Sequence, residues 1–200
     1  LRRGPWKIVQ VSARRGIPLA NYQQCSHLKA LDLVASTDVT VGASIGNDYS
    51  ISPDVIVCRP PLSDEEINQS QELVDRVSAL GTDLRLSNGA LPFLHASVSC
   101  KWTLRSDRAQ NARSEALNLI RNRKGRLPHT VVVTGEPTPS RLASLAAGTG
   151  DIDCVYHIAL PELERAVANL GQDEAEHMLR ILIEGRRLKD ISDLPLDLTL

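Results

Sequence analysis

The sequence predicts an α/β protein, because candidate strands and candidate helices alternate along the chain. Two runs rich in β-branched residues, DVIVC at 54–58 and TVVVT at 130–134, are typical of short strands. Helices are predicted between and after such strands, among them 109–120 and 173–184. The predicted fold class is therefore α/β.

The individual elements follow from periodicity and turn residues. Residues 6–12 (WKIVQVS) alternate bulky apolar and polar side chains, which predicts a half-buried strand. Residues 94–102 alternate similarly, so a strand there would put Ser99 and Lys101 on one face. The remaining predictions are helices at 22–35, 64–80 (opened by a Ser63–Glu66 capping box), 140–147 and 161–170, a loop with at most a short strand at 36–47, a turn around 87–89 and a strand at 152–158.

Length and composition favour one globular domain spanning 1–200. Hydrophobic residues make up 42% of the 200 positions and charged residues 24%, which is ordinary for such a domain. No apolar run approaches the roughly 18 residues that cross a bilayer, so a membrane protein is excluded. The chain starts without Met or a signal peptide, which predicts that it begins within a longer protein and lacks that protein's N-terminal portion.

The four cysteines are scattered along the chain. They form no CxxC pair and have no histidine at metal-ligand spacing, so neither a zinc site nor a disulfide framework is indicated. Buried, reduced thiols in a cytoplasmic protein are the interpretation that we adopt.

Positive charge is concentrated in one segment. The formal net charge of the chain is only −1, yet residues 101–126 contain eight Lys and Arg against two acidic residues, an excess of six. Such a segment suits a polyanion, although the protein as a whole is not basic.

Three polar residues have the chemistry of metal-dependent phosphodiester hydrolysis, which needs oxygen ligands for the ion and a cation near the phosphate. Asp54 opens a strand after Pro53, Lys101 ends a later strand, and Glu115 lies on the helix that follows. If the two strands pair, Asp54 and Lys101 can converge and Glu115 can approach them. The alternative is turn chemistry for Asp54, a solvated edge charge for Lys101, an ion pair with Arg108 or Arg113 for Glu115, and a packing role for Ser99.

The segment Arg105-Ser106-Asp107-Arg108 suits recognition of G·C base pairs. An Arg can satisfy O6 and N7 of guanine, and a carboxylate accepts from N4 of cytosine. The alternative is that Ser106 or Asp107 caps a helix and that the arginines are solvated. Further along, Arg123 and Lys124 fit phosphate contacts at a helix end, or else a solvated basic C-terminus.

These residues resemble a known family in three places: Pro53-Asp54, Ser99-Cys100-Lys101, and Arg105-Ser106-Asp107-Arg108 followed by Glu115. They resemble the NgoMIV family of type II restriction endonucleases, a branch of the PD-(D/E)xK nucleases. In that branch a Ser replaces the acidic residue two positions before the lysine, and a glutamate on the next helix stands in for it. The resemblance runs from about Pro18 to the C-terminus and includes 94–129, 131–157 and 188–198.

The resemblance implies a restriction-endonuclease-like core, a central mixed sheet flanked by helices. It implies that Asp54 binds Mg²⁺ with help from the main-chain carbonyl of Cys100, that Lys101 is the catalytic lysine, and that Glu115, with Ser99, completes the site. It further implies that Arg105, Asp107 and Arg108 read a central CCGG of double-stranded DNA. The remaining implications are a GCCGGC site, 5'-phosphate ends, a restriction-modification system and a homotetramer, a dimer of dimers.

Two other functions compete with this interpretation. A non-enzymatic or truncated, inactive DNA-binding module would explain the basic segment but leave Asp54, Lys101 and Glu115 without a role. A metabolic α/β enzyme could use Gly148-Thr149-Gly150 as a nucleotide loop, but this motif lacks a further glycine and precedes a strand where a nucleotide loop follows one.

Overall fold

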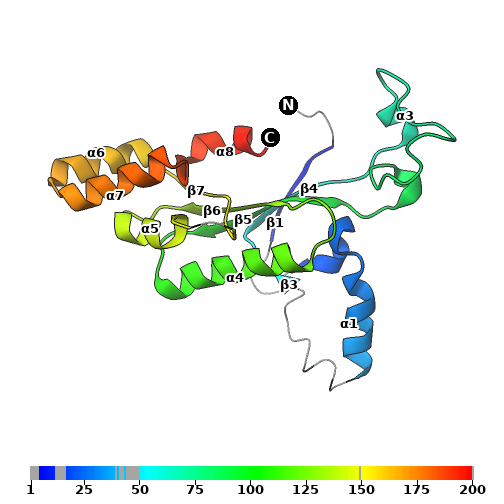
Figure 1. Cartoon of the computed structure of the whole chain (residues 1–200), viewed down its shortest axis with the longest axis horizontal. Coiled ribbons are helices and arrows are strands. Elements are labelled where there is room, and N and C mark those ends of the chain that lie inside the picture. The colour runs from blue at the N-terminus through cyan, green and yellow to red at the C-terminus, as the bar shows by residue number, and fades with distance from the viewer. Residues whose placement is uncertain are drawn as a thin grey trace.

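The computed structural model of the protein describes residues 5–11, 17–38, 40, 43, 50–148 and 150–199. At its centre is a six-stranded sheet with the strand order β1-β4-β5-β6-β7-β8 (Figure 1). Strands β2 and β3 pair with each other separately. The strands are β1 (Lys7–Gln10), β2 (Ile17–Pro18), β3 (Ser50–Ile51), β4 (Val55–Arg59), β5 (Phe93–Lys101), β6 (His129–Thr134), β7 (Cys154–His157) and β8 (Leu188–Asp190).

Helices flank this sheet, so the predicted α/β class is confirmed. In Figure 1, α4 and α5 run along one face of the sheet and α6 and α7 lie together at one end of the molecule. The α-helices are α1 (Leu28–Thr37), α3 (Asp64–Ile67), α4 (Ser106–Asn122), α5 (Pro139–Ala146), α6 (Leu160–Leu170), α7 (Asp173–Glu184) and α8 (Leu194–Asp197), and the 3-10 turns are η1 (Leu19–Asn21), η2 (Gln23–Cys25), η3 (Leu86–Asn88) and η4 (Ile191–Asp193). Within the described ranges, no helix has the length and apolar character that a membrane crossing requires.

The sheet is mixed. Strands β1, β4 and β5 pair antiparallel, whereas β5, β6, β7 and β8 pair parallel, with helical crossovers between successive strands. Lys101 pairs with Thr134 and Thr134 with His157, so the last residues of three parallel strands lie side by side at one edge. Because β4 runs opposite to β5, the start of β4 lies at the same edge, where Val55 pairs with Val98.

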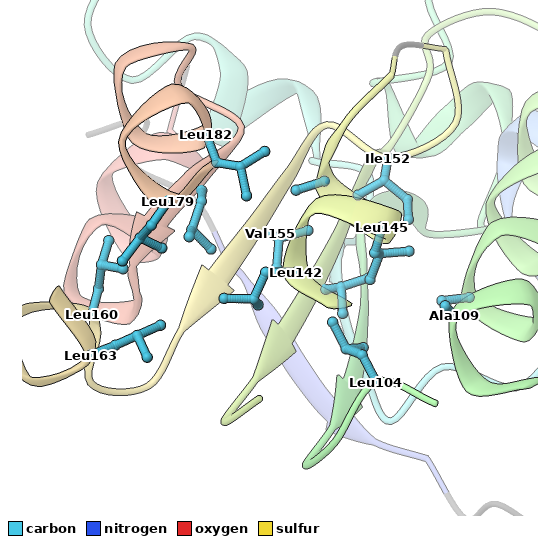
Figure 2. Close-up of a cluster of buried hydrophobic side chains, with 14 of the residues drawn as sticks. Leu104, Ala109, Leu142, Leu145, Ile152, Val155, Leu160, Leu163, Leu179 and Leu182 are labelled. Atoms are coloured by element: carbon cyan, nitrogen blue, oxygen red, sulfur yellow. The ribbon is translucent and has the colours of Figure 1, made fainter. Parts of the chain in front are cut away.

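Apolar side chains cover both faces of the sheet. Figure 2 shows the larger cluster, in which Leu142 and Leu145 of α5 gather with Val155 of β7 and with leucines of α6 and α7. On the opposite face, Tyr156 belongs to a smaller cluster against which Leu194 packs. A third cluster, under the N-terminal segments, includes Leu19, Leu28, Ile56 and Leu119.

Helix α4 packs through small side chains. Ala109, Ala112 and Ala116 are buried, and Leu119 is 1% exposed. Small residues allow the helix axis to approach its neighbours closely, and Glu115 lies half-buried beside this apolar side. The predicted helix at 109–120 is confirmed and extends beyond both predicted ends.

The predicted long helix at 64–80 is wrong beyond its first turn. The capping box is present, but α3 has only four residues. The Asn68 side chain hydrogen-bonds to main-chain groups of Leu73 and Val74, and Arg85 donates to three carbonyl groups between 75 and 79. Side chains thus take the main-chain partners that a helix would use.

Predictions near the N-terminus need correction. All four residues of β1, which is the edge strand of the sheet, are exposed rather than half-buried. The helix predicted at 22–35 begins only at Leu28, after the turn η2. The loop predicted at 36–47 is wrong at its start, where α1 continues to Thr37, and Thr40 and Ala43 are helical; its other residues beyond Asp38 lie outside the described ranges.

Other predictions agree with the structure. Strands β4, β5, β6 and β7 and helices α5, α6 and α7 lie within about two residues of their predicted bounds, and the turn around 87–89 includes η3. The cysteines are free thiols, and Cys25, Cys58 and Cys154 are buried as predicted. Cys100 is exposed, contrary to the prediction, because it lies near the open end of β5.

Candidate active site

Asp54 and Lys101 meet at the edge where β4 begins and β5 ends. Oδ2 of Asp54 accepts a hydrogen bond from the main-chain N–H of Cys100 at 2.6 Å and lies 3.2 Å from Nζ of Lys101. The main-chain N–H of Asp54 donates to the carbonyl of Val98, which continues the antiparallel ladder and fixes the register. The carboxylate side chain is 38% exposed and the lysine side chain 20%, so solvent reaches the pair. The predicted convergence is confirmed.

Ser99 and Glu115 both line a small cavity of about 10 Å³ between β5 and α4. Ser99 is 6% exposed, and its Oγ has no hydrogen-bond partner among the described residues. The main-chain N–H of Ser52, two residues before Asp54, and the charges of Asp54 and Lys101 all act on the carboxylate of Glu115. The four predicted residues of the candidate active site therefore gather at one place.

Burial raises the pKa of Glu115 above its usual value. The Lys101 ammonium and the Ser52 N–H act in the opposite direction, and the Asp54 carboxylate adds to the rise. Glu115 thus shares the electrostatic environment of Asp54 and Lys101, while burial disfavours its charged form.

The alternative partners of Glu115 are engaged elsewhere. Arg113 lies 3.5 Å from a carboxylate oxygen of Asp151 and donates to carbonyl groups at the end of α5. Arg108 donates to Oγ1 of Thr103 at 3.3 Å. Within the described ranges, Glu115 forms no ion pair with either arginine, so an inward-facing role fits better than a surface ion pair.

The oxygen donors at this edge fit a hard divalent cation. Mg²⁺ is commonly held by one or two protein carboxylates together with phosphate and water oxygens. Asp54 and Glu115 are two such carboxylates. In the part of the chain that the structure describes, no group of three or more His, Cys, Asp or Glu is placed to hold a metal.

The segment Arg105–Arg108 forms the start of α4. Arg105 is the N-cap residue, and neither Ser106 nor Asp107 caps the helix, since both belong to its first turn. All four side chains are exposed. Arg105 and Ser106 border an open hollow of about 580 Å³ between the starts of α4 and α5. Capping by Ser106 or Asp107 is therefore not observed, whereas both arginines are exposed to solvent, as the alternative expected, and are accessible to a ligand.

Two residues near this hollow were missed in the sequence analysis. Arg141, on α5, lines the same hollow as Arg105. Glu136, in the loop after β6, is 0% exposed and accepts a hydrogen bond from the main-chain N–H of Leu104 at 2.7 Å. Their position in the sequence could have indicated them, because both residues follow strand β6, which runs parallel to β5. Ligand sites of parallel sheets lie at the C-terminal ends of the strands.

Arg123 and Lys124 lie away from this group. They follow the last turn of α4. Because α4 has 17 residues, it separates Arg123 and Lys124 from the arginines at its start by roughly 25 Å. Arg123 donates to the carbonyl of Gly125, and the main-chain N–H of Lys124 donates to the carbonyl of Gln24. The predicted phosphate contacts of Arg123 and Lys124 would therefore form at some distance from the candidate active site.

Comparison with known proteins gives the class of protein, a restriction endonuclease. The family model described as the NgoMIV restriction enzyme matches residues 1–200. The chain therefore belongs to the NgoMIV restriction enzyme family, as the sequence resemblance predicted. The competing metabolic interpretation finds no support; of its motif, Thr149 lies outside the described residues.

A curated relative is the type II restriction enzyme NgoMIV of Neisseria gonorrhoeae. It is 57% identical over 198 residues, and the match covers 99% of this chain and 69% of the relative. Among solved structures, a complex of the restriction endonuclease PspGI with substrate DNA matches with a TM-score of 0.35 and 20% identity. That match covers 52% of this chain and 39% of the PspGI chain.

Proposed function

We infer that the protein cleaves double-stranded DNA at a palindromic, CCGG-centred site, GCCGGC, in a reaction that depends on Mg²⁺. The observation that carries this proposal is the approach of Lys101 to Asp54, 3.2 Å apart at the open edge of the sheet, with Glu115 beside them. Family membership supports site-specific DNA cleavage as the reaction. It also favours an enzyme over a purely DNA-binding module, and one endonuclease domain spanning 1–200.

The residues of the site would divide the chemistry among them. Asp54 and Glu115, with the carbonyl of Cys100, would hold the divalent ion, which when bound stabilises negative charge on the scissile phosphate. The ammonium of Lys101, held beside Asp54, would contact the phosphate or the attacking water. Ser99 would leave room for the Glu115 carboxylate, because its small side chain lines the same cavity. Release of the 3' oxygen leaves the phosphate on the 5' end.

The residues at the start of α4 would recognise the bases. The exposed guanidinium groups of Arg105 and Arg108 match the O6 and N7 acceptors of guanine, and Asp107 matches the N4 donor of cytosine. Ser106, between them, would contact DNA from the same turn. Arg123 and Lys124, at the far end of α4, would bind phosphates of the flanking duplex.

A palindromic target requires subunits related by a two-fold axis. We therefore propose a dimer as the unit that recognises one site, and a homotetramer, a dimer of dimers, as the complete assembly. The protein would act in the cytoplasm, and it would belong to a restriction-modification system.

The proposal is tested by incubating the protein with plasmid DNA in MgCl₂ and sequencing the ends. We expect cleavage at GCCGGC, 5'-phosphate ends and no cleavage when the ion is chelated. A matched plasmid with the central CCGG changed to CGCG, and the variant Lys101→Ala, serve as controls and should give no product. Equal cleavage of both plasmids, or cleavage without a divalent ion, would contradict the proposal.

A further inference from the structure

Glu136 is a fully buried carboxylate outside the candidate active site. It lies in the loop between β6 and α5, and its side chain is 0% exposed. Removing a carboxylate from water is costly unless hydrogen bonds or charges compensate. The partners of Glu136 therefore indicate what the residue does.

Those partners belong to two neighbouring loops. Oε2 of Glu136 accepts from the main-chain N–H of Leu104 at 2.7 Å, and Oε1 accepts from that of Thr138 at 3.1 Å. The guanidinium of Arg141 lies 3.6 Å away and is half exposed. Burial raises the pKa of Glu136, but these hydrogen bonds outweigh it, with the Arg141 charge in support, and the pKa lies below its usual value. The residue is thus held as a carboxylate.

A second contact joins the same two loops. The main-chain N–H of Gly135 donates to the carbonyl of Trp102 at 3.2 Å, directly after the paired ends of β5 and β6. A side chain at Gly135 would lie only 3.3 Å from the Trp102 ring, so the loops pass in close contact. Two residues after Trp102, the hydrogen bond from the Leu104 N–H to Glu136 holds the loop after β5 at a second point.

The loop after β5 leads directly into the proposed base-reading segment. Leu104 precedes Arg105, and its side chain is 2% exposed in the core beside α5 (Figure 2). Arg105, the N-cap of α4, makes no side-chain capping hydrogen bond. The main chain just before Arg105 is therefore held in place by the hydrogen bond from the Leu104 N–H to the buried carboxylate of Glu136.

We propose that Glu136 is a positioning residue for base recognition, which holds Arg105 and the first turn of α4 in the orientation that reads the central G·C pairs. The inference rests on the proposed function, because it presumes that Arg105 contacts a base. Glu136 itself touches no DNA, since it has no exposed surface. Its action passes through the Leu104 N–H.

A residue that only stabilises the fold would lower stability without changing discrimination. The test therefore compares Glu136→Gln and Glu136→Ala with Asp197→Asn, which alters another hydrogen-bonded carboxylate. Asp197 accepts from the Tyr156 hydroxyl at 2.7 Å and from Lys189 at 2.6 Å, and Tyr156 packs on the other face of the sheet from α4. Each variant is assayed for its free energy of unfolding and for affinity toward a GCCGGC duplex and a duplex with one central G·C pair replaced.

We expect Glu136→Gln to lower the affinity ratio between the two duplexes roughly tenfold, the factor for removing one hydrogen bond to a charged acceptor. Glu136→Ala should lower it further, whereas Asp197→Asn should keep the wild-type ratio even where its stability loss is equal. Added to Arg105→Ala, Glu136→Gln should lower the ratio little more, because both changes act on the same contact.

Two outcomes overturn the inference in distinguishable ways. If Arg105→Ala lowers discrimination and neither Glu136 variant differs from Asp197→Asn, Glu136 is structural and the base-reading assignment stands. If Arg105→Ala itself leaves the ratio unchanged, the base-reading assignment fails, and the positioning role falls with it.

Discussion

Nζ of Lys101 lies 3.2 Å from Oδ2 of Asp54, although the two residues are 47 positions apart in the sequence. The antiparallel register of β4 and β5 brings them together, and the N–H of Cys100 holds the carboxylate in place. The relationship depends on strand pairing, so it is fixed by the central sheet rather than by a mobile loop.

Asp54→Asn or Lys101→Ala should lower the cleavage rate by on the order of a thousandfold, because each removes a group that acts on the scissile phosphate. Affinity for GCCGGC should change little, since neither residue is proposed to read bases. Single-turnover cleavage and equilibrium binding measure the two effects. Asp64→Asn is the matched control, because Asp64 forms a 2.6 Å ion pair with Arg85 outside the site. Near-normal cleavage by either site variant would remove that residue from the mechanism.

Glu115→Gln should abolish cleavage without loss of stability. Burial raises the pKa of Glu115, so the folded state disfavours the charged form relative to the unfolded chain. A neutral side chain of the same shape should therefore leave the free energy of unfolding at pH 7 unchanged or slightly higher. Denaturant unfolding and a cleavage assay on the same sample give both values. A variant that lost stability and kept its cleavage rate would assign Glu115 to the fold.

The sequence predicted the site better than the peripheral segments. Period-two alternation predicted Ser99 and Lys101 on one face of a strand, and three- and four-residue spacings predicted Glu115 on the side of α4 that carries Ala112 and Leu119, both of which are buried. These patterns are local in the sequence, and the strand and helix that they predict keep them in the folded core. The segment after α3 could not be predicted in this way, because its carbonyl groups are held by the guanidinium of Arg85, which pairs with Asp64 across 21 positions of the sequence.

Glu136 illustrates a second limit of sequence analysis. A single Glu between Gly135 and Pro137 has no periodic signal and resembles an exposed loop residue. Its burial follows from the close approach of two loops that begin 33 residues apart, at the paired ends of β5 and β6. Only the tertiary structure shows that its partner is the main chain before Arg105.

Asp197 should make stability depend on pH in the acidic range. Burial raises its pKa, but hydrogen bonds from Lys189 and Tyr156 outweigh burial, so the pKa in the folded state lies below the usual value of about 3.9. The resulting stabilisation is fully present above that value and is lost as the pH falls through the folded-state pKa. Relative to Asp197→Asn, the protein should be more stable by about 1–2 kcal/mol at pH 7, and the difference should shrink toward pH 3. Urea unfolding of both proteins at pH 7, 5 and 3 measures it; a difference that is constant with pH would refute the assignment.

Cleavage of a plasmid with two GCCGGC sites should be faster than cleavage of a one-site plasmid. A dimer of dimers binds two sites together, and on one plasmid the second site is present at a high effective concentration. Adding a short duplex that contains the site should accelerate the one-site reaction. Equal rates on both plasmids, with no effect of added duplex, would indicate a simple dimer.

Residues at the two ends of α4 should differ in how they bind DNA. Arg105→Ala or Arg108→Ala should cost about 1–3 kcal/mol in discrimination at a central G·C pair, because each removes hydrogen bonds to a base edge. Arg123→Ala or Lys124→Ala should weaken binding of cognate and random DNA alike and reduce the slope of log affinity against log salt by about 0.9 for each phosphate that the variant no longer neutralises. Binding of a cognate, a centrally substituted and a random duplex across a salt series separates the two behaviours. If Arg105→Ala weakened all three duplexes equally, the start of α4 would be a phosphate clamp, and the base-reading residues would lie elsewhere in the protein.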